Sequence, residues 1–485
     1  MHDAAQPETL DPADWRAYRA TLHALVDRCI DQLAGIRDLP WQPVDTAFCD
    51  TIPLGAARDG HGIEATAAAL CDRIMPFHSG NVHPRFFGWA QGTGNAAALM
   101  AELVAATMNS NCGGRDHGAT YVEREVIRWS ADCFGLPAAA SGVLVTGTSQ
   151  ATVLALAAAR VAALGAEVRT LGLSGAPQLT LYAAEGTHNA VVKAAELLGL
   201  GAAAVRSVRL DPATDALDMK ALRQHVARDR RAGARPFCVD GTAGSVDRGA
   251  FDPLRAIAEF CAAEALWFHV DGAFGAWLNI AGEPWRRLTD GIECADSIAL
   301  DFHKWMFVQY DCGLVLMRDG AAHRAAFAAR PAYLAPQNTG LGGAEPWFCD
   351  YGTDLSRGFR ALKVWATLHA YGQARLAELI AFDCRLAAHM GKLVEAAPDL
   401  ELTCPVRSNV CCFSAVAADP NADPSTLNAA IVERLQLDGS AVFSTTRIGG
   451  RTVIRACMIN HRTRIADVDG AVAAVRAARR AIVSA

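Results

Sequence analysis

The chain has 485 residues, of which 52% are hydrophobic and 20% charged, and its formal net charge at pH 7 is −6. A chain of this length and composition can bury a large core, which excludes a disordered protein and predicts one large domain with smaller partners. It contains no run of lysine and arginine residues, so the expected ligand is a small molecule and not nucleic acid or a membrane surface.

Most of the fifteen cysteines are scattered singly through apolar stretches, as at Cys29, Cys71 and Cys238, without the CxxC spacing that is typical of zinc sites. We therefore expect free thiols, no metal and a cytoplasmic location. The acidic N-terminal residues do not resemble a signal peptide, and charges such as Glu102 and Arg160 interrupt the long apolar stretches. The sequence therefore predicts no membrane-spanning helix.

The N-terminal part predicts two helices. The pair Asp11 and Pro12 is typical of a helix start, and an apolar stripe at helical spacing follows it. A second helix is expected over residues 63–75, since a proline comes next. Residues 84–123 are rich in loops, with one helix expected over 95–108.

From residue 142 onward, short apolar runs alternate with helical patterns. Strands are expected over 142–145, 179–183, 204–208, 236–239, 266–270, 297–300 and 313–317, and helices over 150–164, 189–198, 218–230 and 253–263. This alternation predicts an α/β fold with a mostly parallel sheet covered by helices. Such sheets bind ligands at the carboxyl ends of their strands, which carry Gly147, His188, Thr242 and Asp271 here.

Residues 330–357 are rich in proline, glycine and asparagine and have no clear periodicity, which predicts a lid over a binding site. Beyond them, helices over 359–371 and 375–396 and strands over 409–414 and 453–458 predict a smaller α/β domain. We therefore expect an N-terminal helical segment over 1–85, a large domain over 86–372 that includes the lid, and a small domain over 373–485.

Two neighbouring strand ends carry the central chemical pattern. One run ends at Asp271, and the next leads through Asp301 and His303 to Lys304. A lysine enclosed by apolar strands tends to lose its proton, because desolvation disfavours the ammonium, and a neutral amine can attack a carbonyl. Asp271 would meet a cationic ring nitrogen. The pair predicts a site for pyridoxal 5'-phosphate, whereas each residue alone fits a strand cap or a solvated turn.

The segments HVDGAFG at 269–275 and ADSIALDFHKW at 295–305 resemble the signature of the group II pyridoxal phosphate-dependent amino-acid decarboxylases. This family includes aromatic-L-amino-acid and glutamate decarboxylases, and the resemblance extends over roughly residues 82–455. It implies fold type I of the pyridoxal phosphate-dependent enzymes, with Lys304 as the Schiff-base lysine and His303 on the phosphate side. It also implies a homodimer with active sites at the subunit interface.

The resemblance assigns further residues to the cofactor. Thr148 and Ser149 open a helix and would bind the phosphate, although the stretch alone also fits an ordinary N-cap. His188 matches the histidine that stacks on the pyridine ring, whereas alone it fits a cap or a surface residue. Thr242 matches a threonine near the ring, and Ala273 is small enough for the ring to lie over it.

The sequence departs from the family's pattern in two places. The strand end before Thr242 reads Asp240 and Gly241, where relatives tend to have small apolar residues. The implied substrate-binding residues are His83, Trp89 and Arg455, but Ala90, Gln91 and Gly92 follow Trp89 where aromatic decarboxylases have aromatic and aliphatic walls. Arg455 fits a structural ion pair equally well. Aromatic, acidic and other polar amino acids therefore all stay open as substrates.

The expected activity is that of a carboxy-lyase that converts an L-amino acid into its amine and CO2. Counting back without gaps from RGFRALKVW at 357–365, Phe348 falls at the lid tyrosine that acts as the acid in aromatic decarboxylases, with Tyr351 three residues on. A phenylalanine there is typical of aldehyde synthases, which release an aldehyde, ammonia and hydrogen peroxide. A transaminase and a non-catalytic cofactor-binding protein are further alternatives.

Overall fold

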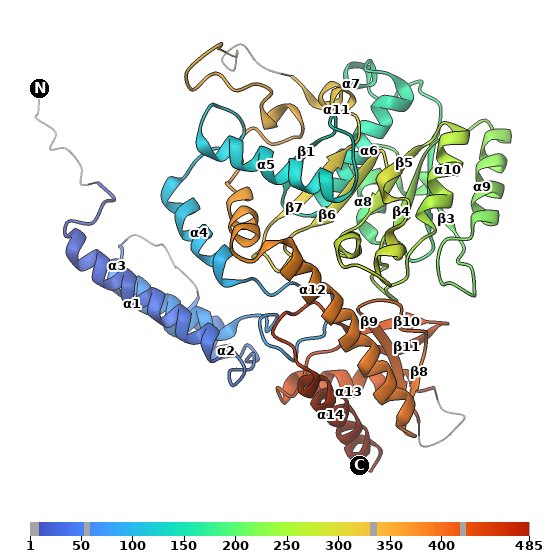
Figure 1. Cartoon of the computed structure of the whole chain (residues 1–485). Coiled ribbons are helices and arrows are strands. Elements are labelled where there is room, and N and C mark those ends of the chain that lie inside the picture. Colours follow the sequence, from blue (N-terminus) through green and yellow to red (C-terminus); the bar gives the residue numbers. More distant parts are fainter. Residues whose placement is uncertain (1–8, 53–58, 330–336, 418–422, 485) are drawn as a thin grey trace, which may run out of the picture.

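The structure is a computed structural model that describes residues 9–52, 59–329, 337–417 and 423–484 (Figure 1). The N-terminal helices α1 (Trp15–Ala34), α2 (Thr46–Thr51) and α3 (Ile63–Ala69) lie to one side of the body. The start predicted for α1 was wrong, because the Asp14 carboxylate, and not Asp11, accepts hydrogen bonds from the first helical N–H groups. The helix predicted over 63–75 is present, with a π-helical turn at Leu70–Ile74.

A seven-stranded sheet organises the large domain, in the order β1-β7-β6-β5-β4-β2-β3. Its strands are β1 (Ser141–Val145), β2 (Leu179–Ala184), β3 (Val205–Val208), β4 (Arg235–Thr242), β5 (Trp267–Asp271), β6 (Ser297–Asp301) and β7 (Gly313–Met317). The expected strands are all present, and only β7 is antiparallel to its neighbours, β1 and β6. Most of these strands are buried along nearly their whole length, which is why continuous apolar runs predicted them.

Helices cover the sheet as the alternation predicted. They are α6 (Thr148–Leu164), α8 (Asn189–Leu197), α9 (Met219–Arg231) and α10 (Leu254–Glu264). Shorter helices are α7 (Val168–Leu171) and α11 (Gly320–Phe327). The region expected to be rich in loops holds α4 (Ala96–Met108) and also the start of a helix that was not expected, α5 (Gly118–Cys133).

The C-terminal part forms a second sheet with its own core. Its order is β10-β11-β9-β8, and every pairing is antiparallel. The elements are β8 (Leu400–Leu402), β9 (Val410–Ala415), α13 (Ser425–Leu437), β10 (Ser444–Ile448), β11 (Arg451–Cys457) and α14 (Ile465–Val483). The long helix α12 (Ala361–Ala396), with a kink at Gly372, runs between both sheets (Figure 1). The domain limits stay a prediction.

No helix among the described residues is long and apolar enough to cross a membrane. The core of the large domain is dense around the strand ends, where Trp277 and Trp305 are fully buried. Trp277 donates its indole N–H to the carbonyl oxygen of Asp301, and Trp305 donates to the carboxylate of Asp383 on α12. The segment that carries the predicted site is therefore anchored on both sides.

Candidate active site

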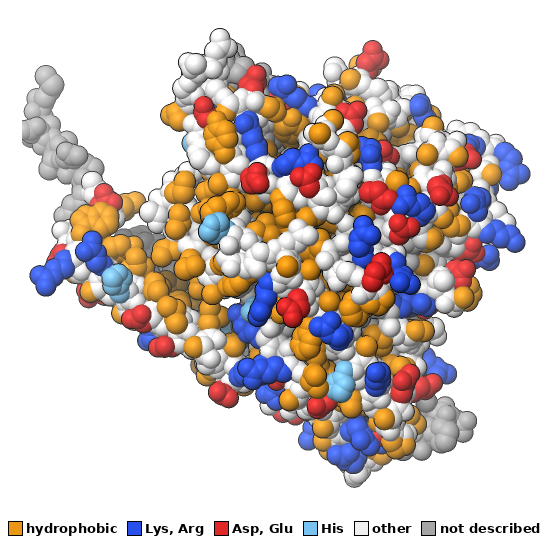
Figure 2. Space-filling view, in the orientation of Figure 1, with side chains coloured by type: hydrophobic (Ala, Val, Ile, Leu, Met, Phe, Trp, Pro, Cys, Tyr) orange, Lys and Arg blue, Asp and Glu red, His pale blue; other side chains and the backbone are white. Residues whose placement is uncertain are grey.

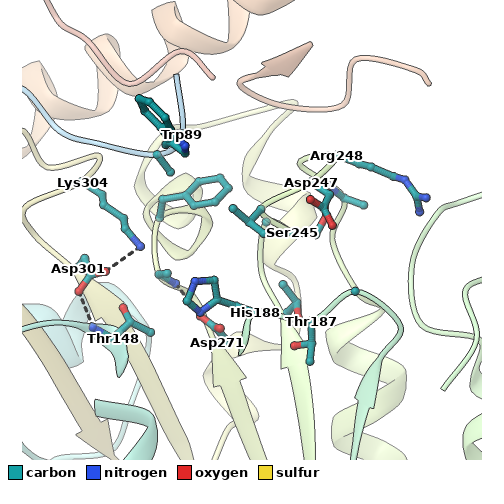
Figure 3. A pocket seen from close by; sticks show the side chains of 18 of the residues that line it. Trp89, Thr148, Thr187, His188, Ser245, Asp247, Arg248, Asp271, Asp301 and Lys304 are labelled. Atoms are coloured by element: carbon teal, nitrogen blue, oxygen red, sulfur yellow. Dashed lines mark hydrogen bonds and ion pairs between the residues drawn. The ribbon is translucent and has the colours of Figure 1, made fainter. Parts of the chain in front are cut away.

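A cavity of about 570 Å³ opens at the carboxyl ends of the central strands (Figure 3). Most of the predicted site residues line it: Trp89, Thr148, Ser149, His188, Thr242, Asp271, Ala273, His303 and Lys304. Thr148 and Asp301, which are 153 positions apart in the sequence, meet here because the strands that precede them end at the same edge of the sheet. Further lining residues to which the sequence assigned no role include Thr187, Phe274, Asp301 and Tyr310.

Lys304 interacts with two carboxylates, those of Asp301 and Asp271. Its Nζ is 3.0 Å from Oδ2 of Asp301, a residue that is only 2% exposed. Desolvation lowers the pKa of Lys304, but the attraction and hydrogen bond of Asp301, together with the charge of Asp271, outweigh it and raise the pKa. The expectation that burial alone leaves Lys304 neutral is therefore wrong.

Asp301 links the lysine to the start of α6. Its Oδ1 accepts a hydrogen bond of 2.7 Å from the backbone N–H of Thr148, as Figure 3 shows. His303 Nε2 lies 3.6 Å from the same carboxylate. The sequence placed Asp301 at a strand end near Lys304 but assigned it no role, because only the folded sheet brings it beside Thr148.

Asp271 ends β5, next to β6, where its backbone pairs with Ala299. It is 4% exposed and accepts a hydrogen bond of 3.1 Å from the N–H of Ala273. Burial raises the pKa of Asp271, while the charges of Lys304 and His188 act in the opposite direction. A carboxylate in this position can hold a positive charge that is itself buried in the cavity.

The start of α6 leaves donors free for an anion. Gly147 caps the helix without any side-chain hydrogen bond, so the alternative of an ordinary Ser/Thr N-cap is wrong. The buried Oγ1 of Thr148 has no hydrogen-bond partner, and neither has the buried Oγ1 of Thr242. Together with Ser149, these groups can bind phosphate and ring oxygens.

Two histidines line the cavity in fixed orientations. Nδ1 of His188 accepts a hydrogen bond of 3.2 Å from the N–H of Ala190, so His188 caps α8 and also lines the cavity. Nδ1 of His303 accepts one of 3.0 Å from Cys312, and its ring packs on Tyr310 with centroids 4.3 Å apart. Burial lowers the pKa of His303, which favours its neutral form.

Two predicted substrate-binding residues lie outside the cavity lining. His83 is fully buried, with its Nε2 3.1 Å from the carbonyl oxygen of Arg37. Arg455 is 3% exposed and donates a hydrogen bond of 2.9 Å to the carbonyl oxygen of Trp89. Arg455 therefore supports the backbone of Trp89, a residue that does line the cavity, and the substrate-binding roles of His83 and Arg455 stay predictions.

Phe348 and Tyr351 also lie away from the cavity. Phe348 is 5% exposed and packs 5.2 Å from the guanidinium of Arg357, while the Tyr351 ring packs on His323. Arg357 is held in turn by a buried ion pair with Glu123 of α5. Phe348 and Tyr351 thus lie on a packed segment of the chain, and their catalytic roles stay predictions. Residues 330–336 of the predicted lid lie outside the described residues.

These groups fit the cofactor that the sequence implied. The unpartnered hydroxyls of Thr148 and Thr242 face a cavity that also contains a lysine amine and a buried carboxylate. A phosphate, an aldehyde and a basic ring nitrogen are the partners that such groups bind. Among the parts of the chain that the structure describes, no cluster of ligands suited to a metal ion was found.

Comparison with known proteins gives consistent results. The pyridoxal-dependent decarboxylase conserved domain matches residues 51–416. Aromatic-L-amino-acid decarboxylase of Bacillus atrophaeus is 31% identical over 385 residues, which cover 79% of this chain and 78% of that protein. The crystal structure of Oryza sativa TDC with PLP and tryptamine has 28% identity, a TM-score of 0.90 and coverage of 98% of this chain and 100% of its own. Rhodiola rosea 4-hydroxyphenylacetaldehyde synthase has 26% identity, a TM-score of 0.86 and coverage of 98% and 100%.

Proposed function

Because the chain belongs to the pyridoxal-dependent decarboxylase family, we propose that it converts an aromatic L-amino acid into its amine and CO2. The chain is a pyridoxal phosphate-dependent carboxy-lyase with the fold-type I architecture. The observation that carries the proposal is the pairing of Lys304 and Asp271, which end adjacent strands at one cavity.

We assign the cofactor to named groups of this cavity. Lys304 Nζ is the amine that holds it, and Asp271 keeps its ring nitrogen positively charged. The hydroxyls of Thr148 and Ser149 and the N–H groups at the start of α6 other than that of Thr148, which donates to Asp301, bind its phosphate, with His303 on that side. His188 and Ala273 enclose the ring, and Thr242 donates toward its ring oxygen. When it is bound by these residues, pyridoxal phosphate would supply an acceptor for the electron pair that departing CO2 leaves behind.

The chain's own contribution is to hold protons and exclude water. Oδ2 of Asp301 lies 3.0 Å from Lys304 Nζ, so the amine has a proton acceptor beside it whenever it must become neutral. The buried position of Asp271 excludes water from its carboxylate, which strengthens its interaction with a cation. Trp89 lies at the cavity with its side chain half exposed, where it can cover a bound substrate.

An aromatic substrate is supported by the relatives' activities and by the cavity wall. Trp89, Phe274 and Tyr310 give the wall an aromatic character. Asp247 and Arg248 line its polar side, which would suit the competing class of acidic or polar substrates. CO2 release should be measured for tryptophan, tyrosine, phenylalanine and glutamate. Turnover of glutamate without turnover of any aromatic amino acid would overturn the proposal.

The alternative product is an aldehyde, since the chain is also similar to a 4-hydroxyphenylacetaldehyde synthase. Neither Phe348 nor Tyr351 lines the cavity of the single chain, and their role in the choice between the two products stays a prediction. Amine, aldehyde and hydrogen peroxide should be measured together on the best substrate. We expect amine and CO2 in equal amounts, and peroxide in equal amount with CO2 would establish the aldehyde synthase.

We further propose a homodimer whose partner covers α4. In Figure 2 hydrophobic side chains gather over α4 beside α1, and Met100 and Leu103 on α4 are 66% and 50% exposed. An apolar patch of this kind is typical of an interface. Sedimentation should give a dimer for the wild type and for Leu171→Glu on α7, and a monomer for a Met100→Glu, Leu103→Glu variant. A monomeric wild type would refute this.

The reducing cytoplasm is the proposed location. The support is chemical: the fifteen cysteines are free thiols, many of them buried. Fractionation of the producing cells, followed by detection of the protein, tests the location directly, and recovery outside the cytoplasmic fraction would contradict it.

A further inference from the structure

Asp240 lies in the same buried layer as the proposed ring-nitrogen partner. It precedes Thr242 by two residues on β4 and is fully buried. In the parallel pairing of β4 and β5, Asp240 is opposite His269 and Thr242 is opposite Asp271. Because side chains alternate along strands, all four point to one face of the sheet.

The carboxyl group of Asp240 has few partners. Its Oδ2 accepts a hydrogen bond of 3.2 Å from the hydroxyl of Thr187, and its Oδ1 has none. Nε2 of His269 faces Oδ1 at 4.0 Å and is also without a hydrogen-bond partner. Across the described ranges, no lysine or arginine forms an ion pair with Asp240. Burial of an ionised carboxylate that has only one hydroxyl donor lowers the stability of the fold, whereas burial of the neutral acid does not carry this penalty.

The groups around Asp240 also favour its neutral form. Burial, followed by the charges of Asp271 and Asp252, raises the pKa of Asp240 well above its usual range. Burial lowers the pKa of His269 to about 4, so this neighbour is neutral. Burial also raises the pKa of the Cys238 thiol on the same strand. Among the described residues no lysine or arginine forms an ion pair with Asp240, whereas the charge of Lys304 favours the ionised form of Asp271.

We propose that Asp240 is a positioning residue that remains a neutral acid, anchors Thr187 beside the cavity and leaves the negative charge of this layer to Asp271. Thr187 precedes His188 in the turn between β2 and α8, and Figure 3 shows both at the strand ends. The hydrogen bond from Thr187 therefore ties the turn that carries His188 to β4. Two ionised carboxylates in one buried layer would repel each other, so a neutral Asp240 favours an ionised Asp271.

The consequence for the ring nitrogen rests on the proposed function, whereas the protonation state of Asp240 does not. Asp240→Asn is the matched variant, because an amide keeps the size, an acceptor for Thr187 and a donor, and removes the titration. Asp240→Leu removes the hydrogen bond as well. Both are compared with the wild-type holoenzyme.

The first measurement is thermal stability against pH. The folded pKa lies above the value of about 4 for an unfolded aspartate, so the folded protein binds the extra proton in this window. Wild-type stability therefore falls as pH rises toward the folded pKa, and Asp240→Asn lacks this loss. Its Tm relative to the wild type should rise by about 2 °C or more between about pH 5 and about pH 9. A difference that is constant with pH would overturn the proposal.

The second measurement follows the visible absorbance of the bound cofactor. Asp240→Asn should keep the wild-type pH titration and cofactor affinity, and Asp240→Leu should bind the cofactor about tenfold more weakly through the loss of one buried hydrogen bond. A shifted titration in Asp240→Asn, or normal affinity in Asp240→Leu, would refute the assignment. If Asp240→Asn does not fold, infrared spectra of isotope-labelled aspartate in the wild type decide whether a buried neutral acid is present. A wild type without decarboxylase activity would refute the proposed function and leave these results on Asp240 valid.

Discussion

Replacing Asp301 with asparagine should lower the pKa of Lys304. The distance from Nζ to Oδ2 is 3.0 Å, which corresponds to about 5 kcal/mol at an effective dielectric constant of about 20. That energy equals about 4 pKa units. The asparagine dipole keeps part of the attraction, Asp271 remains, and the lysine side chain is 21% exposed, so we expect a decrease of about 2 units.

The assay is the rate at which the apoenzyme captures pyridoxal phosphate, followed by absorbance across a range of pH. Only the neutral amine attacks the aldehyde, so the midpoint of the rate profile reports the pKa of Lys304. This pKa is raised in the wild type, which places the midpoint at alkaline pH. In Asp301→Asn the midpoint should move toward neutral pH, and capture at pH 7 should be faster.

Asp247→Asn is the matched control, because Asp247 lines the same cavity but its carboxylate bonds to Thr446. Its midpoint should equal that of the wild type. An unchanged midpoint in Asp301→Asn would show that Asp301 does not hold the lysine proton. A shift of similar size in both variants would instead show a general effect of cavity charge.

Three further outcomes are expected. Borohydride reduction of the holoenzyme should leave the pyridoxyl group on Lys304, and peptide mapping that finds it on another lysine would exclude the site. Asp271→Asn should keep bound cofactor, measured by absorbance, while turnover falls by about three orders of magnitude, since an uncharged ring is a poor electron acceptor; near-normal turnover would make Asp271 structural. Glu123→Gln should lower the free energy of unfolding by about 3 kcal/mol or more in denaturant titrations, because Arg357 would be left as a buried unpaired charge. Asp132→Asn, which breaks an exposed pair with Arg128, should change it by less than about 1 kcal/mol.

The sequence predicted the central strands well because their residues are buried on both faces. Ser297–Asp301 and Gly313–Met317 are buried throughout, and such runs have few alternative structures in a chain of this size. It missed α5 because the buried face of that helix includes Thr120, Glu123 and Ser130. These polar residues become core residues only through tertiary partners. The partner of Glu123 is Arg357, which lies 234 positions away in the sequence.

The residues that a motif fixed line the cavity, whereas the residue reached by counting register does not. Lys304 and Asp271 line the cavity as the motif predicted, although their catalytic roles are still to be tested. Phe348 was reached by counting through a coil, which has no period to correct an error of register. The structure places it against Arg357 instead.

The charges of the three aspartates Asp240, Asp271 and Asp301 could not be read from the sequence, since each belongs to an apolar strand. Their partners differ: Asp301 has an ammonium and a backbone N–H group, Asp271 has a backbone N–H group and more distant cations, and Asp240 has one hydroxyl. The charge of a buried carboxyl follows the number and strength of such donors. The same residue type can therefore hold the lysine proton, carry the negative charge under the cavity and act as a neutral anchor within one sheet edge.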